Sequence, residues 1–179
     1  MLPAEQKQAV VKKQQPFLYR NGKSGNTDGK KDGVTMIEQD TVKLLRECDA
    51  GIKMGVKSID DVLAHVRDAQ FHRVLCECKR EHDELQKQID EQLARFEDDG
   101  KEPAAMAKGM SWMKSNMKLA MEDSDHTVAD LITDGCNMGV KSLNRYLNQY
   151  KAADEYSKDI TKRLIHLEQK LAEDIRVYL

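Results

Sequence analysis

The sequence predicts an all-α protein, a four-helix bundle built from two repeated helical hairpins. Residues 54–58 and 138–142 have the same sequence, MGVKS, and each copy lies in a long stretch with the hydrophobic period of an α-helix. His82 and His166 are separated by the same 84 positions as the two MGVKS copies. Charged residues make up 34% of the chain and aromatic residues only 5%, which favours helices with wide solvated faces. A hairpin that occurs twice indicates a bundle with two related halves.

The chain divides into a short N-terminal segment and one helical domain. We expect residues 1–33 to be flexible and basic, because residues 21–33 are rich in Gly, Asn, Asp and Lys and cannot bury enough apolar surface to fold. Residues 34–179 are long enough to form a single bundle with its own core. Residues 1–34 carry a charge of +4, which leaves −6 for the remainder of a chain whose net charge is −2. This distribution does not fit a nucleic-acid-binding protein, which usually gathers Lys and Arg on one folded face.

The first hairpin is expected to consist of helices at about 35–66 and 68–97. Apolar residues recur every three or four positions in both ranges, which places one stripe of each helix in the core. Gly100 follows the second range and favours the left-handed conformation that ends many helices. The inward positions are Leu45, Cys48, Ile52, Val56, Ile59, Leu63 and Val66 in the first helix, and Phe71, Leu75, Cys78, His82, Leu85, Ile89, Leu93 and Phe96 in the second.

A Met-rich helix is expected in the long connection between the hairpins, from Lys101 to about residue 121. Its methionines recur at helical spacing, with Trp112 beside them. Methionine packs adaptably, so we interpret the stripe as core packing, with a ligand site or a partner groove as the alternative. The methionines are Met106, Met110, Met113, Met117 and Met121.

The second hairpin is expected to consist of helices at about 125–151 and 154–178. Ser124 or Asp125 can cap the first of these helices. The short connections make the helices of each hairpin antiparallel, and the long connection returns the chain along the bundle. The inward positions are Val128, Leu131, Gly135, Met138, Leu143, Tyr146 and Tyr150, followed by Ile160, Leu164, Leu167, Leu171, Ile175 and Tyr178.

This order of elements resembles the ferritin-like superfamily, and more closely its small uncharacterised bacterial members. The resembling stretches are LLRECDAGIKMGVKS, the Gly-Lys-Glu-Pro and Met-Ser-Trp-Met-Lys region, and DGCNMGVKSLNRYL, all within residues 35–179. The resemblance implies the fold and a stress- or spore-associated context. It does not single out an activity, because the superfamily includes iron oxidation, peroxide reduction and proteins with no known metal.

A di-iron site of this kind requires Glu on two helices and Glu-x-x-His on the other two, all facing the bundle axis. Lys79 and Arg163 stand three positions before His82 and His166, where the carboxylates are required. The periodicity also places His82 on an apolar stripe and His166 on a solvated face. We therefore expect no metal and no cofactor. The candidate ligands, should iron or manganese bind, are His82, Glu84, His166 and Glu168.

The four cysteines show neither the spacing of a zinc site nor that of a redox pair. We interpret them as small apolar residues. Cys78 lies one helical turn before His82, so the alternatives are a soft-metal pair or a small redox site that includes Cys48 or Cys136.

Gly55 and Gly139 are the glycines of the two MGVKS copies. A glycine inside a helix costs about 1 kcal/mol relative to alanine, so its presence twice needs a reason. We interpret both as positions where the first helices of the two hairpins cross closely.

The sequence favours a non-catalytic, metal-free bundle that acts through protein contacts or as a homo-oligomer. It contains no phosphate-binding glycine loop, no nucleophile elbow and no strand pattern to carry either, so no enzyme class is favoured. A cytoplasmic protein without a transmembrane segment is expected, because no apolar run reaches about 18 residues and no signal peptide is visible. One alternative is a ferritin-like metalloprotein that binds iron or manganese and handles oxygen or peroxide. Another is a helical module whose basic N-terminal segment recruits a protein partner or a membrane surface.

Overall fold

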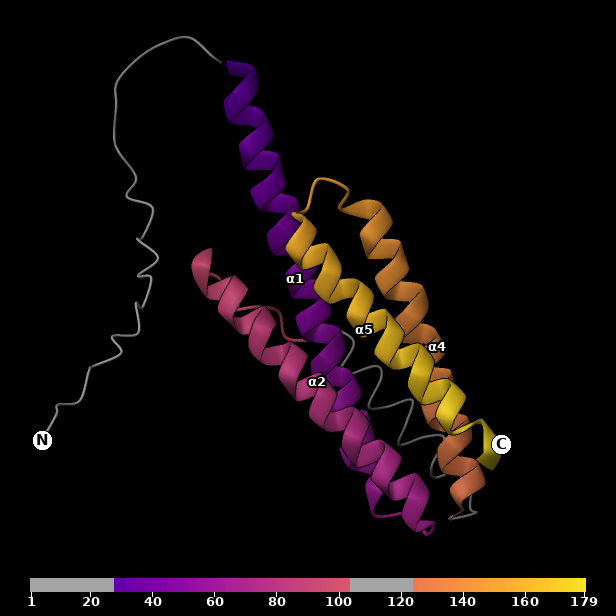
Figure 1. Ribbon diagram of the computed structural model, residues 1–179. Helices are drawn as coiled ribbons and strands as arrows, with labels where there is room; N and C mark the ends of the chain where they lie inside the picture. The colour runs from indigo at the N-terminus through magenta and orange to yellow at the C-terminus, as the bar shows by residue number, and fades with distance from the viewer. Residues whose placement is uncertain (1–27, 104–123) are drawn as a thin grey trace, which may run out of the picture.

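The structure is a computed structural model that describes residues 28–103 and 124–179. Within these residues the chain forms four α-helices and one short 3-10 helix, and no strand (Figure 1). The prediction of an all-α protein with four bundle helices is confirmed. The predicted Met-rich helix and residues 1–27 of the predicted flexible segment lie outside the described residues. The elements are α1 (Asp28–Leu63), α2 (Ala69–Arg95), α4 (Asp125–Gln149), α5 (Glu155–Asp174) and the 3-10 helix η1 (Arg176–Tyr178).

The helices pair as two antiparallel hairpins, α1 with α2 and α4 with α5 (Figure 1). The hairpins pack together through α2 against α5 and α1 against α4, and α1 also contacts α5 across the bundle. The starts of α2 and α4 lie at the same end, where the Asp125 carboxylate accepts hydrogen bonds from the backbone N–H groups of Arg67 and Asp68 at 2.7 and 3.0 Å. Since both helices leave this end, α2 and α4 run in the same direction.

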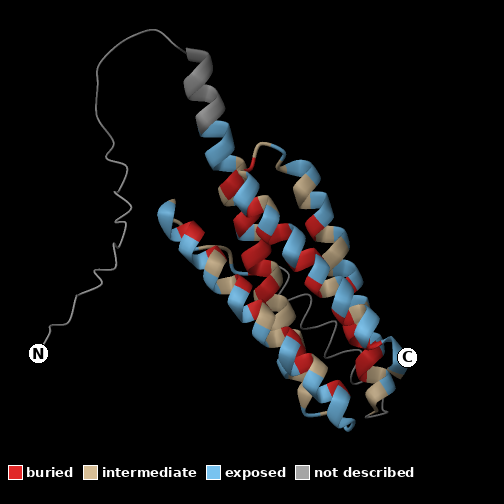
Figure 2. Ribbon diagram, in the orientation of Figure 1, coloured by how far each residue is buried: buried red, intermediate tan, exposed pale blue. Residues whose placement is uncertain are grey.

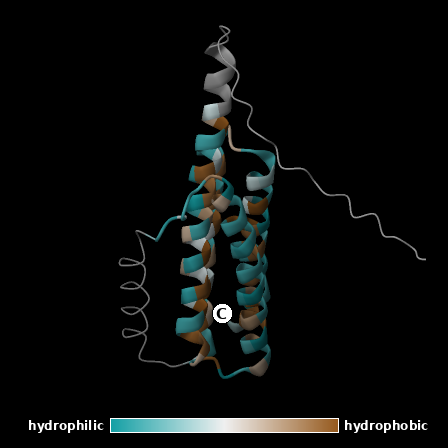
Figure 3. Cartoon of the chain, turned by 90° about the vertical axis from the view of Figure 1, so that its left-hand side faces the viewer, coloured by the Kyte–Doolittle hydropathy of each residue, from teal (hydrophilic) through white to brown (hydrophobic). Residues whose placement is uncertain are grey.

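The core lies between the four helices, and exposed residues cover their outer faces (Figure 2). Brown and teal alternate along each helix in Figure 3, the appearance expected of amphipathic helices. The predicted stripes of α2 and α5 are buried apart from Phe96 and Tyr178, which are half-buried. The largest fully buried apolar side chains are Phe71, Leu44, Leu45, Ile52, Leu75, Ile89, Ile160, Leu164 and Ile175.

Buried positions recur between the two hairpins, at two different spacings. In α1 and α4 the spacing is 84, the spacing of the MGVKS copies. In α2 and α5 it is 86, which is also the spacing of their N-cap residues, Asp68 and Asp154. The connections, residues 64–68 and 150–154, are equally long, so the two additional residues lie at the end of α4, which continues past Leu147, the equivalent of Leu63. Buried pairs that show this are Leu44 with Val128, Ile52 with Cys136, Ile59 with Leu143, Leu75 with Thr161, Cys78 with Leu164 and Leu85 with Leu171.

Helix ends follow local sequence signals, with one difference from the prediction. Ser124 caps α4, as expected, by accepting a hydrogen bond from the Thr127 N–H at 3.3 Å. The residue that directly follows the C-cap of α2 is Glu97, which is left-handed (φ 53°); Gly100 also has a positive φ (81°) but lies three positions later. The Glu97 and Asp98 N–H groups bond back to the carbonyls of Ala94 and Leu93. This pair of bonds is a Schellman motif and satisfies the last carbonyls of α2.

Residues 28–33, which the sequence assigned to the N-terminal segment, belong to α1, because each residue added to an existing helix gains a hydrogen bond without a new nucleation cost. One further prediction was wrong in detail. In α4, Gly135 and Met138 were expected to face inward, but both are exposed, Met138 at 62%. Cys136, one position after Gly135 and two before Met138, is the buried residue at this level.

Candidate functional site

A cluster of polar side chains lies inside the bundle, formed by Cys78 and His82 of α2, Cys136 of α4 and Glu168 of α5. We call it the central cluster. His82 is 1% exposed, and its Nε2 lies 3.1 Å from Oε1 of Glu168, whose side chain is 12% exposed. Counted from the N-caps of their helices, His82 and Glu168 occupy the same position, so the cluster joins equivalent points of the two hairpins.

Both ring nitrogens of His82 have partners. Nδ1 lies 2.9 Å from the carbonyl oxygen of Cys78, one turn earlier in the same helix. A carbonyl can only accept, so Nδ1 carries a proton and donates it. Nε2 faces the Glu168 carboxyl group, which leaves one further proton shared between the imidazole and the carboxylate.

The surroundings of His82 favour its charged form. Burial lowers the pKa of His82, but hydrogen bonds to Cys78 and Glu168 and the charge of the Glu168 carboxylate outweigh burial and raise the pKa to about 10. The burial expected from the sequence is confirmed. Burial alone would favour the neutral imidazole, and the apolar stripe of α2 gives no sign of the carboxylate on α5 that reverses this preference. His82 and Glu168 thus form a buried ion pair at neutral pH.

The Cys136 thiol of the central cluster stays protonated. Burial and then the charge of Glu168 raise the pKa of the Cys136 thiol, which hydrogen-bonds to that carboxylate. The Cys78 sulfur lies 3.5 Å from Nδ1 of His82. Cys48 is not part of the cluster: it bonds to Thr161 Oγ1 at 3.2 Å, and burial raises its pKa to about 12. A protonated thiol is a poor nucleophile and a poor metal ligand, so neither Cys136 nor Cys48 has the thiolate that either role requires.

The glycines of the MGVKS copies provide the space for the ion pair. A Cβ atom at Gly55 would lie 3.3 Å from Nε2 of His82 and 3.7 Å from Oε1 of Glu168. A Cβ atom at Gly139 would lie 3.4 Å from Cδ of Glu168. The nearest atoms at both glycines are therefore side-chain atoms of the pair. Their predicted role in a close helix crossing stays a prediction.

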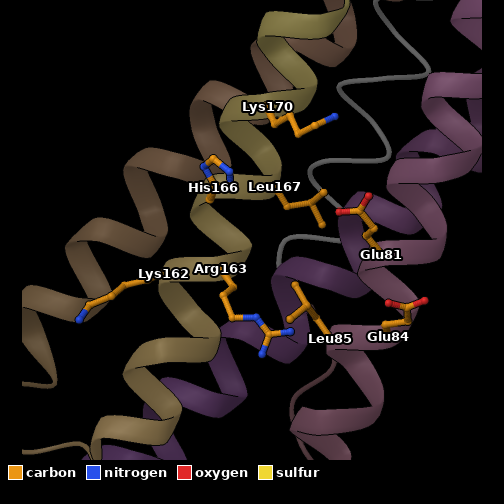
Figure 4. Close-up of a pocket in the computed structure, with 8 residues that line it drawn as sticks. All are labelled: Glu81, Glu84, Leu85, Lys162, Arg163, His166, Leu167 and Lys170. Carbon is orange, nitrogen blue, oxygen red and sulfur yellow. The ribbon is translucent and has the colours of Figure 1, made fainter.

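Glu84 and His166, the other two candidate ligands, lie outside. Both are exposed, and both line a surface hollow of about 390 Å³ between α2 and α5, which we call the α2–α5 groove (Figure 4). Glu84 also pairs with Arg80 at 2.7 Å. Of the four candidates, His82 and Glu168 contact each other in the interior, whereas Glu84 and His166 line the same groove at the surface.

The sequence did not reveal the role of Asp49, a carboxylate of α1 that is 1% exposed. Its oxygens accept from Nε2 of Gln86 at 2.6 Å and from the backbone N–H of Lys101 at 2.7 Å, and Lys53 Nζ lies 3.1 Å away. Gly100 has a φ of +81°, and a Cβ there would collide with Asp49. Asp49 therefore fastens the chain after α2 to α1. The only signal in the sequence was its place at the edge of the apolar stripe.

Within residues 28–103 and 124–179, no group of three or more His, Cys, Asp or Glu side chains is arranged to hold a metal ion. No helix of the described chain is both long and apolar enough to cross a membrane. Comparison of the sequence with protein-family models and curated proteins, and comparison with solved structures, gave no match.

Proposed function

We propose that this chain is a non-catalytic helical bundle, ferritin-like in the order of its helices, that acts in the cytoplasm through protein contacts or as an oligomer. The observation that carries the proposal is the closed central cluster. Both nitrogens of His82 are engaged, and Glu168 is held by His82 and Cys136. A catalytic or metal centre needs donor atoms open to a substrate or an ion. In the central cluster, the His82 nitrogens and the Glu168 carboxylate already have partners within the protein.

The residues at the carboxylate positions of a two-metal site support the same proposal. Lys79 forms an ion pair with Asp60, and Arg163 donates to Oε1 of Gln88 at 2.8 Å. Asp49, the other deeply buried carboxylate, is committed to the chain after α2. The positions where a di-iron site needs carboxylates thus carry Lys79 and Arg163, and Asp49 is already hydrogen-bonded to other residues.

The recurrence of buried positions supports the interpretation of two related hairpins. In that interpretation His82 and Glu168 descend from one equivalent position, and their divergence to opposite charges allows them to pair. A single polar contact in an apolar core can fix the register of the helices around it, because any slip would leave charges unpaired. We infer that this is what the central cluster does.

Metal analysis of the full chain, purified without a chelator, tests the proposal against the ferritin-like metalloprotein. We expect well under one iron, manganese or zinc per chain, and no rise in melting temperature when Fe²⁺, Mn²⁺ or Zn²⁺ is added. A metal that binds the folded state must raise stability by mass action. Two tightly held iron ions per chain, lost in a His82→Gln/Glu168→Gln variant, would overturn the proposal.

A further inference from the structure

The α2–α5 groove carries opposite charges on its two sides. The α5 side is basic, with Lys162, Arg163 and Lys170, and the α2 side is acidic, with Glu81 and Glu84 (Figure 4). Leu85 and Leu167 form its floor between these sides. The Glu81 carboxylate raises the pKa of Lys170 together with the closer Asp174, so the two sides interact within one copy of the chain.

We propose that this groove is the contact surface between two copies of the chain, related by a twofold axis parallel to α2 and α5. The inference rests on the proposed function, for which it names the partner. Rotation about such an axis lays α2 of one copy over α5 of the other, at the same height. The acidic side of each groove then faces the basic side of the other, and the contact is isologous.

The charges exclude the other simple arrangement. A twofold axis perpendicular to the helices would lay α2 on α2 and α5 on α5, with like charges opposed, which disfavours the contact. The charges also disfavour a uniformly acidic or uniformly basic partner, because one side of the groove would repel it. The matching partner has both signs on opposite sides of a groove, and this chain presents that pattern itself.

The contact is expected to be weak and sensitive to salt. Exposed ion pairs contribute little individually, and screening weakens them within a Debye length of about 8 Å at physiological ionic strength. Leu85 and Leu167 are already largely buried in one copy, at 5% and 6% exposure, so they add little apolar driving force. Complementary charge decides which arrangement forms.

Sedimentation equilibrium of the full chain tests the inference, with two charge-reversed variants. The first is Glu81→Lys/Glu84→Lys, which makes the groove wholly basic, and the second is Arg163→Glu/Lys170→Glu, which makes it mostly acidic. We expect wild-type protein at about 0.02 M salt to approach twice the 20.4 kDa of one chain as concentration rises, and to dissociate at about 0.5 M salt. Each variant alone should associate at least about tenfold more weakly, and an equimolar mixture of the two should restore association.

The matched control is Asp83→Lys/Asp90→Lys, which makes the same charge change at exposed positions on the other flank of α2, the one nearer α1. It should associate like the wild type. The inference is overturned if wild-type protein stays monomeric at low salt, if the mixture fails to associate, or if the control loses association as the groove variants do. A variant that does not fold, judged by circular dichroism, leaves the salt dependence of the wild type as the deciding measurement. A metal-free monomer would overturn this inference alone, whereas a dimer that holds two iron ions would overturn the proposed function alone.

Discussion

Alanine substitutions at four glycines test whether the MGVKS copies make room for the ion pair. Gly51 and Gly135 are separated by the same 84 positions as Gly55 and Gly139, and a Cβ at either would meet nothing within 4 Å. Alanine is favoured over glycine inside a helix by up to about 1 kcal/mol. Gly51→Ala and Gly135→Ala should therefore stabilise the protein by roughly 0.5–1 kcal/mol each.

Gly55→Ala should have the opposite effect. Its Cβ would lie 3.3 Å from Nε2 of His82, so the ring must move by a few tenths of an ångström and lengthen a bond to Glu168 that is already 3.1 Å. Hydrogen bonds to charged groups contribute about 1.5–3 kcal/mol, so partial loss of one outweighs the gain in helix propensity. We expect a net destabilisation of about 1 kcal/mol. Gly139→Ala, with its nearest contact at 3.4 Å from carbon, should change stability little.

Urea denaturation followed by circular dichroism measures these four free energies of unfolding, provided that the slope with denaturant is unchanged. The reasoning depends on the difference between Gly55 and its neighbour Gly51, one helical turn away. If Gly55→Ala stabilised the protein as much as Gly51→Ala, the space at Gly55 would have no role in holding the pair.

Three further predictions concern charge and the end of the chain. The pKa of His82 is raised to about 10 in the folded protein from an unfolded value of 6.5. Its contribution to stability is therefore fully present below pH 6.5 and is lost as the pH rises through 10. The difference in free energy of unfolding between the wild type and His82→Gln, measured by urea denaturation, should become smaller over that pH range. His166→Ala should change the free energy of unfolding by less than about 0.5 kcal/mol, against about 3–5 kcal/mol for His82→Ala, which leaves the Glu168 carboxylate without its partner; equal effects would contradict the inward and outward assignment. Tyr178→Phe removes the 2.8 Å hydrogen bond to Asp68 but keeps the ring stacked on Phe71, and should lower the melting temperature; an unchanged melting temperature would show that this hydrogen bond does not hold η1 to the start of α2.

The sequence correctly predicted burial where the periodicity of a single helix determines it. The apolar stripe of α2 predicted a buried His82, and the stripe of α5 predicted an exposed His166; both are confirmed. The prediction that Met138 faces inward was wrong because the apolar face of α4 is broad, so several rotations of the helix about its axis bury it equally well. Cys136 is the residue of α4 equivalent to Ile52 at the spacing of 84, and both are buried. Aligning α4 with α1 at that spacing would therefore have given the correct orientation of α4.

The pairing of His82 with Glu168 could not be predicted, because the fixed spacing of 84 aligned His82 with His166. That spacing holds for α1 and α4 but changes to 86 for α2 and α5, because α4 continues two residues further than α1 before its hairpin turns. Counting from the two N-cap aspartates would have aligned His82 with Glu168. The charge of His82 could not be predicted for the same reason. The periodicity of α2 shows that His82 is buried, but the carboxylate that keeps it charged lies on another helix.

A double-mutant cycle on His82 and Glu168 tests most directly whether the centre of the bundle is a structural ion pair. Removal of one partner of a buried ion pair leaves a charge uncompensated and costs about 3–5 kcal/mol, whereas replacement of both by apolar residues costs far less. We therefore expect His82→Leu and Glu168→Leu to be strongly destabilising alone, and the double variant to be more stable than either, with a coupling of at least about 1.5 kcal/mol. The same cycle on His166 and Glu84, which share the α2–α5 groove, should show coupling close to zero. Additive losses at His82 and Glu168, with no coupling between them, would contradict the ion pair and the role proposed for it.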